Sequence, residues 1–115
     1  MEDMTDCIFC KIAGKQIPSK IVYEDQKALA FEDIHPQAPI HILIIPKEHI
    51  PNITQVRDPE IVGYLYKIAN KLAEEKGIKT SGYRLVVNYG PDAGMAVDHL
   101  HLHLLGGRPL SWPPG

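Results

Sequence analysis

The sequence predicts a single α+β domain over residues 1–115, with a largely antiparallel sheet of about five strands, one long helix and a short amino-terminal helix. Three observations support this class. The chain has the length of one ordinary domain, its apolar segments are short and separated by turn residues, and one longer segment has helical periodicity. Most strand connections are too short for parallel crossovers, so neighbouring strands are expected to be antiparallel.

The expected elements follow one another with proline and glycine between them. They are a helix at 6–15, strands at 21–24, 28–32 and 41–45, a helix at 59–76, and strands at 83–88 and 98–105. In the first helix Asp6 is a suitable cap and Gly14 a suitable end. Residues 25–27 are enough for a hairpin loop. The run at 41–45 is almost wholly apolar, which suits a central strand buried on both faces.

The long helix has the clearest signals. Asp58 can cap it, Pro59 fits its first turn, and Gly77 follows its last turn. An apolar stripe with helical spacing is formed by Ile61, Leu65, Ile68 and Leu72. This stripe predicts that one face of the helix packs against the sheet.

Charge and hydropathy exclude several classes of partner. Twelve Lys and Arg against fourteen Asp and Glu give a net charge of −2 and a pI near 6.3, so no basic surface for nucleic acid or an anionic membrane is expected. No apolar run approaches the ~20 residues of a membrane helix. The first six residues are acidic, unlike a secretory signal. We therefore expect a cytoplasmic protein with reduced thiols.

Histidine alternates with leucine near the carboxyl end of the chain. In a strand His99, His101 and His103 would share one face and the intervening leucines the other. Neighbouring imidazoles would lie roughly 6–7 Å apart, close enough to act on different atoms of one small substrate. Two alternatives are weaker. In the first, histidine is only the polar residue of a half-polar strand, but such strands more often use Thr, Lys or Glu. In the second, the three histidines bind one metal ion, but equally spaced ligands on one straight strand converge poorly on a single ion.

The segment from His99 to Leu105 resembles the His-x-His-x-His-x-x signature of the histidine triad (HIT) family. The other matching blocks are 33–41, 45–49, 83–88, 106–108 and 112–115. The last two blocks are similar to the Hint branch, the purine nucleoside phosphoramidases. The resemblance implies a HIT-like fold, a homodimer, and hydrolysis of the P–N bond of a purine nucleoside monophosphate derivative, with AMP as the expected nucleotide.

The resemblance also implies roles for individual residues. His101 is the nucleophile that forms a nucleotidyl-histidine intermediate, and His103 binds the phosphoryl oxygens. His41 orients or protonates the triad, although it can also simply begin a strand. The expected catalytic set is His41, His99, His101 and His103. Asp33 is assigned to the ribose hydroxyls and Ile34 to the base, although a lone Asp at a strand end is more often a turn residue.

The loop before the triad departs from the branch. Where the branch has Gly-Gln-Ser-Val-Tyr, this chain has Gly94-Met95-Ala96-Val97-Asp98. The expected phosphate-binding groups are the backbone at Gly94, Met95 and Ala96 and the side-chain amide of Asn88, together with His101 and His103. The missing Gln and Ser donors weaken protonation of the leaving group. The alternative function is therefore a nucleotide-binding or interaction module of the same fold with little catalysis.

Cys7 and Cys10 form a Cys-x-x-Cys pair, a pattern found in zinc sites, redox sites and by chance. No strand is expected before the pair, as a thioredoxin-like redox motif would require. Some bacterial and archaeal HIT proteins, and the related galactose-1-phosphate uridylyltransferases, carry a similar pair. This resemblance implies His49 and His99 as the two further ligands of a structural zinc site. Reduced thiols without a metal are the alternative.

Overall fold

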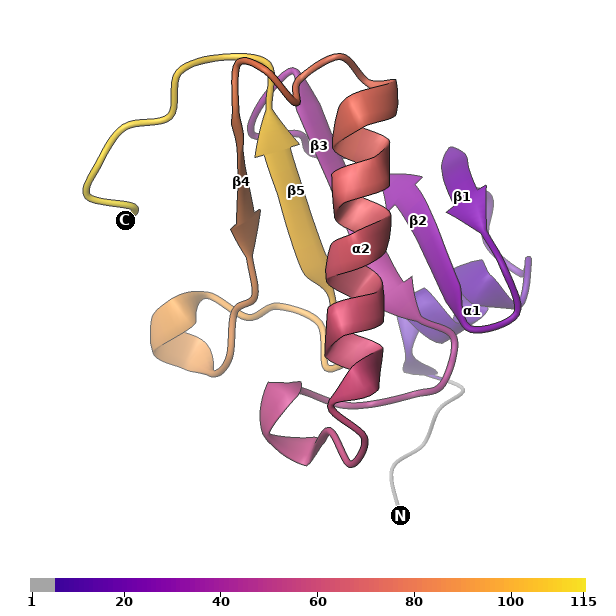
Figure 1. Ribbon diagram of the computed structural model, residues 1–115. Coiled ribbons are helices and arrows are strands. Elements are labelled where there is room, and N and C mark those ends of the chain that lie inside the picture. Colours follow the sequence, from indigo (N-terminus) through magenta and orange to yellow (C-terminus); the bar gives the residue numbers. More distant parts are fainter. Residues whose placement is uncertain (1–5) are drawn as a thin grey trace.

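The computed structural model describes residues 6–115, which form one sheet with helices on both of its faces (Figure 1). The strands are β1 (Ile21–Glu24), β2 (Ala28–Glu32), β3 (Ile40–Pro46), β4 (Tyr83–Val86) and β5 (Leu102–Gly106). Their order across the sheet is β1-β2-β3-β5-β4, and every neighbouring pair is antiparallel. The predicted α+β class with a five-stranded antiparallel sheet is confirmed.

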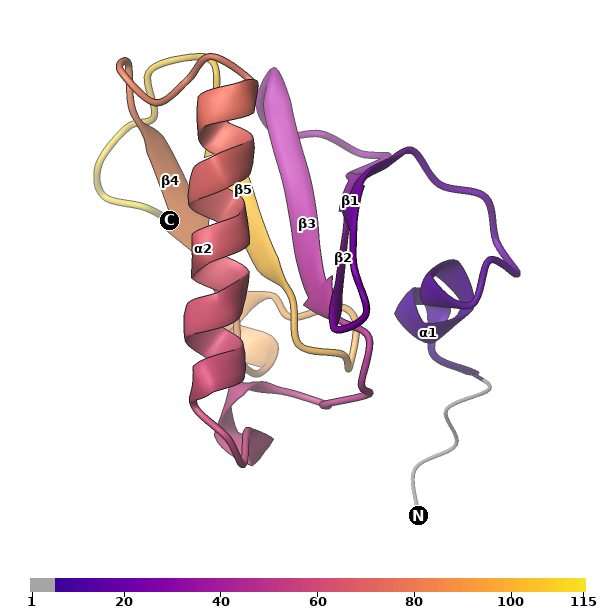
Figure 2. The same cartoon turned by 45° about the vertical axis from the view of Figure 1, so that its right-hand side comes forward.

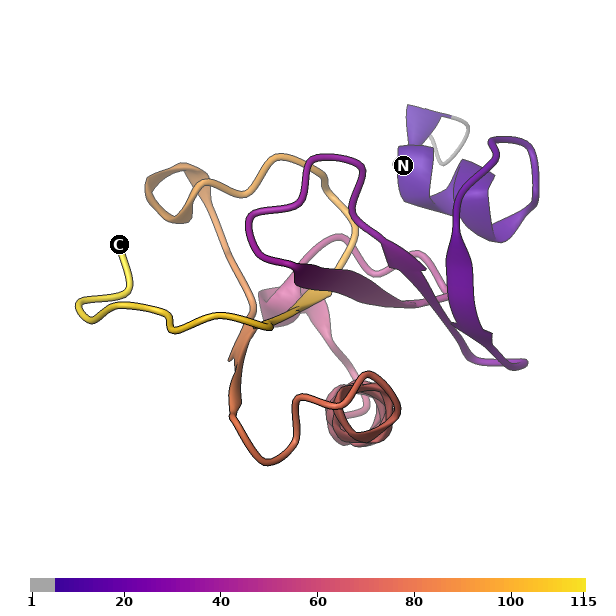
Figure 3. The ribbon, with the colours of Figure 1, turned by 90° about the horizontal axis from the view of Figure 1, so that it is seen from above.

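The two α-helices lie on opposite faces of the sheet (Figures 2 and 3). The long helix α2 (Glu60–Glu75) packs along β3 and β5, and the short helix α1 (Ile8–Ala13) lies on the other face. Short 3₁₀ helices at Ile53–Gln55 and Pro91–Ala93 interrupt the loops. Within residues 6–115 no helix has the length and apolar character needed to cross a bilayer.

Strand β3 separates two hydrophobic cores. Ile42 and Ile44 belong to the core beneath α2, whereas Leu43 and Ile45 belong to the core beneath α1. All four are buried, so the prediction of a central strand buried on both faces is confirmed. The α1-side core is the smaller of the two, and it includes Phe9.

Helix α2 agrees with its prediction to within one residue at each end. It begins at Glu60 instead of Pro59, and the backbone N–H of Glu60 donates to the Asp58 carboxylate at 3.0 Å. It ends at Glu75, and Gly77 has a positive φ of 76°, a conformation that favours glycine.

The first helix is shorter than predicted and is capped by a different residue. It begins at Ile8, not Asp6, and Cys7 is its N-cap. The Cys7 sulfur accepts a hydrogen bond from the backbone N–H of Cys10 at 3.3 Å. The cysteine pair therefore lies in the first turn of α1.

The last strand begins at Leu102, four residues later than the predicted start. The register pairs Ile44 with Leu102, so the next residues in register would bring Pro46 opposite Leu100. Proline has no N–H to donate and cannot extend the ladder normally. The N–H of Leu100 instead donates to the carbonyl of Ile50 at 2.6 Å. Because β5 starts late, β4 also ends early, at Val86 and not at residue 88.

Asp25 ties the β1–β2 turn to α2. Its carboxylate accepts hydrogen bonds from the Tyr23 hydroxyl at 2.6 Å, from the Tyr64 hydroxyl on α2, and from the backbone N–H groups of Lys27 and Ala28 at 2.7 and 2.8 Å. Burial alone would raise the pKa of Asp25, but these hydrogen bonds outweigh it and lower the pKa to about 2. The turn is thus fixed by a carboxylate that is ionised at neutral pH.

Candidate active site and metal centre

Four imidazoles lie around the junction of β3 and β5. His41 is on β3, His103 is on β5, and His99 and His101 are in the segment immediately before β5. Leu43 pairs with His103, which puts the ring of His103 on the α1 face of the sheet. The leucines between the histidines belong to the core under α2, as their alternation predicts.

A chain of hydrogen bonds joins His41 to His103 and determines where their protons reside. The backbone N–H of Gln37 donates to Nδ1 of His41 at 3.0 Å, and a backbone N–H can only donate. In neutral His41 the proton must therefore be on Nε2, which lies 2.9 Å from Nδ1 of His103 and donates to it. His103 then carries its own proton on Nε2. This buried atom has no hydrogen-bond partner within residues 6–115, so it is a donor left for a ligand.

A backbone carbonyl determines the proton position on His101. Its Nδ1 lies 2.6 Å from the carbonyl oxygen of His99, and a carbonyl can only accept. The Nδ1 atom is therefore the protonated one, and Nε2 keeps its lone pair. The rings of His101 and His103 are 5.0 Å apart between centroids, so a nucleophilic nitrogen and a hydrogen-bond donor lie side by side.

These three histidines are shifted towards the neutral form. Burial lowers the pKa of His41, and the Asp33 carboxylate opposes this only in part. Burial also lowers the pKa of His101, against the opposing effect of its hydrogen bond to the His99 carbonyl. Burial and the neighbouring imidazoles of His101 and His41 lower the pKa of His103 to about 4. A neutral imidazole keeps the lone pair that a nucleophilic nitrogen needs.

Asp33 follows β2 and lies beside this chain. Its Oδ2 is 3.4 Å from Nε2 of His41, and its Oδ1 accepts the backbone N–H of His35 at 2.8 Å. Donor atoms of Asp33, His41 and His103 lie within 4.8 Å of one another, the spacing of a possible metal site. The donated proton on His41 Nε2 argues against a metal there, because a ligating nitrogen must present a lone pair. The neighbouring Ile34 is 80% exposed.

A second cluster joins α1 to the rest of the fold. The Cys7 and Cys10 sulfurs lie 3.3 and 3.6 Å from Nδ1 of His99, and the Cys10 sulfur lies 3.2 Å from Nδ1 of His49. The Nε2 of the fully buried His99 donates to the Pro46 carbonyl at 2.8 Å, which leaves a lone pair on Nδ1.

The geometry of this cluster fits a tetrahedral ion. All four donor atoms lie within 4.8 Å of one another. Zinc bonds of about 2.3 Å to sulfur and 2.0 Å to nitrogen separate neighbouring sulfur and nitrogen ligands by about 3.5 Å. The sulfur–nitrogen distances found here, 3.2–3.6 Å, match this separation. Two thiols and two imidazoles are the donor set of a closed structural zinc site.

The loop before the triad holds the remaining predicted residues. Asn88 follows β4, and Gly94, with a φ of 78°, ends the 3₁₀ turn. The Met95 N–H is used within the loop, on the Gly90 carbonyl at 3.2 Å. Within residues 6–115, none of Asn88, Gly94, Met95 and Ala96 hydrogen-bonds to His41, His101 or His103.

Three site residues were missed by the sequence analysis. Gln37 contributes its backbone N–H to His41, and Pro46 contributes its carbonyl to His99. Phe9 places its ring 5.1 Å from that of His101 and 5.9 Å from that of His99, nearly perpendicular to the former. Backbone donors leave no signal in a sequence. The position of Phe9 between two predicted metal ligands was a signal that could have been used.

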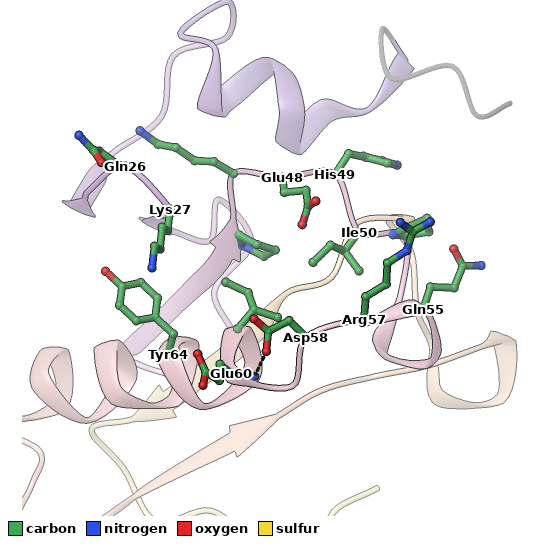
Figure 4. A pocket seen from close by; sticks show the side chains of 14 residues that line it. Gln26, Lys27, Glu48, His49, Ile50, Gln55, Arg57, Asp58, Glu60 and Tyr64 are labelled. Carbon is green, nitrogen blue, oxygen red and sulfur yellow. Dashed lines mark hydrogen bonds between the residues drawn. The ribbon is translucent and has the colours of Figure 1, made fainter.

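One cavity has a lining that includes His49 but none of His41, His101 and His103. Figure 4 shows the side chains that line it. It has a volume of about 730 Å³ and lies between the β1–β2 turn, the segment after β3 and the start of α2. Lys27 and Tyr64 lie at one end and Arg57 at the other, with Glu48 and Asp58 between them. The lining of this cavity therefore carries both positive and negative side chains.

Comparisons with known proteins agree on one family. The HIT domain profile matches residues 14–110. A 14 kDa zinc-binding protein of Zea mays is 50% identical, covering 98% of this chain and 91% of its own length. A HIT family hydrolase from Legionella pneumophila is 52% identical, with a TM-score of 0.93 over 96% of this chain and 100% of that one. Another, from Clostridium thermocellum, is 48% identical, with a TM-score of 0.91 over 95% of this chain and 96% of that one.

The histidine-rich segment, the five-stranded sheet and these matches over nearly the whole chain lead to one conclusion: the protein is a member of the HIT family.

Proposed function

We propose that the protein hydrolyses the P–N bond of purine nucleoside phosphoramidates through a nucleotidyl-histidine intermediate on His101. The observation that carries the proposal is the hydrogen bond from His101 Nδ1 to the His99 carbonyl, which leaves the lone pair on Nε2. The unused N–H of His103 lies next to this nucleophile. Related solved structures are described as HIT family hydrolases, which supports a hydrolytic reaction.

The reaction proceeds in two displacements at phosphorus. First, the Nε2 lone pair of His101 attacks phosphorus, the P–N bond breaks, and the amine leaves with the bonding electrons and takes up a proton. Water then attacks phosphorus, the bond to Nε2 breaks, and the nucleoside monophosphate and a proton are released. The His99 carbonyl keeps the Nδ1 proton and stabilises the positive charge on the ring. The N–H of His103 donates to a phosphoryl oxygen.

The nucleotide is bound by the groups around the triad. Asp33 accepts hydrogen bonds from the ribose hydroxyls, and the exposed side chain of Ile34 covers the base. The backbone N–H of Ala96 and the amide of Asn88 donate to the phosphate, whereas the N–H groups of Gly94 and Met95 are used within the loop on the Pro91 and Gly90 carbonyls. Gly94 has no side chain, which allows the phosphate to approach the backbone of the loop closely. Because Ala96 has no hydroxyl, the departing amine takes its proton from solvent, which limits the rate.

We also infer that Cys7, Cys10, His49 and His99 hold a structural zinc ion. The sulfur–nitrogen distances and the zinc-binding relative from Zea mays support this. Zinc bound there supplies a crosslink between α1 and the sheet, with no open position for substrate. A homodimer and a cytoplasmic location complete the proposal, in keeping with the family resemblance.

A nucleotide-binding module with little catalysis is the second candidate, favoured by the loss of side-chain donors at Met95 and Ala96. The experiment that separates the two incubates the protein with adenosine phosphoramidate, quenches it rapidly and measures the mass of the intact chain. We expect an added nucleotidyl group on the wild type and none on His101→Ala. Tight AMP binding with neither adduct nor turnover would establish the binding module instead.

A further inference from the structure

The nucleophile is held less by the sheet than its position in the motif suggests. Strand β5 begins at Leu102, so His99 and His101 lie outside the ladder. Strand pairing orients a side chain by fixing the pleat of its backbone. For His101 this constraint is absent, although its ring is buried and its Nδ1 makes a short hydrogen bond. Other contacts must fix the orientation of the ring.

Helix α1 provides those contacts by two routes. The first passes through His99, whose side chain lies against both cysteine sulfurs and whose carbonyl accepts the His101 proton. The second is the ring of Phe9, which lies at 86° to the ring of His101. Phe9 is itself buried, between Cys7 and Cys10 in the chain and edge-on to Phe31. Both routes begin at the helix that the Cys/His cluster anchors.

We propose that α1, anchored by the Cys/His cluster, positions the nucleophile through Phe9, whose perpendicular ring holds the His101 ring in the orientation in which Nδ1 meets the His99 carbonyl. The inference rests on the proposed function for its kinetic consequence. Its structural part, the effect of Phe9 on the orientation of the His101 ring, does not depend on the reaction that the protein catalyses. Phe9 and His99 act here as positioning residues, because they act on substrate through His101.

The test compares zinc-loaded wild type with Phe9→Leu, which keeps an apolar side chain but removes the perpendicular ring. The control is Ile12→Val, which trims a buried side chain on the same helix that has no ring contact with the histidines. The first readout is the ¹⁵N spectrum of labelled histidines, which reports which ring nitrogen is protonated. The second is the separation of kcat from KM with adenosine phosphoramidate.

We expect wild type and Ile12→Val to show His101 protonated on Nδ1 only, and Phe9→Leu to show exchange between both nitrogens. The kcat of Phe9→Leu should fall on the order of 10-fold or more, with KM changed much less, because misplacement of a reacting group acts on the chemical step. Cys10→Ser, which releases the helix itself, should shift the spectrum in the same direction.

The proposal is overturned if Phe9→Leu keeps the wild-type histidine spectrum and kcat, or if Ile12→Val changes both as much. Failure of the proposed function looks different. A wild-type protein that turns over no phosphoramidate, but whose His101 proton pattern depends on Phe9, would refute the activity and leave the positioning role supported.

Discussion

Replacing His41 with leucine tests whether this residue acts by orienting His103. The substitution removes the donor to His103 Nδ1 and the acceptor for the Gln37 N–H. Gln37 is exposed, so its N–H can bond to water at little cost, whereas the partly buried Nδ1 of His103 loses about 1 kcal/mol of stabilisation. The larger effect is on catalysis. A misdirected donor to a phosphoryl oxygen should lower kcat on the order of 10²-fold, or about 2.7 kcal/mol.

His41→Gln is the matched control, because its amide can accept from Gln37 and donate to His103 at once. We expect it to recover most of the kcat that His41→Leu loses. Steady-state kinetics with adenosine phosphoramidate, alongside thermal melts of each variant, measure the two effects separately. If glutamine is as inactive as leucine while both melt normally, the relay of hydrogen bonds is not what His41 contributes.

Three further predictions concern the loop, the metal cluster and the β1–β2 turn. Ala96→Ser should raise turnover of adenosine phosphoramidate by supplying a hydroxyl donor to the leaving group; no change or a fall in kcat would contradict this. Cys10→Ser should reduce bound zinc from near one equivalent to well below it and lower Tm, as metal analysis and calorimetry would detect; full zinc retention would count against the site. Asp25→Asn should lower the free energy of unfolding by about 1 kcal/mol at pH 7, after allowance for solvent screening. Because the folded pKa of Asp25 is about 2 and the ordinary value is 3.8, this contribution is present above pH 4 and disappears as the pH falls through 2, so urea unfolding at pH 2 should show little difference.

The elements that local sequence determines were predictable. The apolar stripe of α2 and its Asp58 cap predicted that helix to within one residue. The apolar run in β3 predicted a strand buried on both faces, and the alternation after His99 predicted which side chains enter the core. In each case the signal lies within a few neighbouring residues.

What the sequence could not show depends on partners far along the chain. The start of β5 is set by Pro46, a residue on another strand, through a register that forms only in the folded protein. The cap of α1 is a cysteine, which propensity ranks below the nearby Asp6. The proton positions on the site histidines depend on the backbone N–H of Gln37 and the backbone carbonyl of His99. Almost any residue at these positions would supply the same backbone groups, and only proline lacks the N–H.

The order of strands has a consequence for folding. The two central strands meet late, because His41 and His103 are 62 positions apart in the chain and α2 must be accommodated between them. Closing so long a loop is slow relative to forming the β1–β2 hairpin or the helix. The centre is therefore not assembled until β5 inserts between β3 and β4.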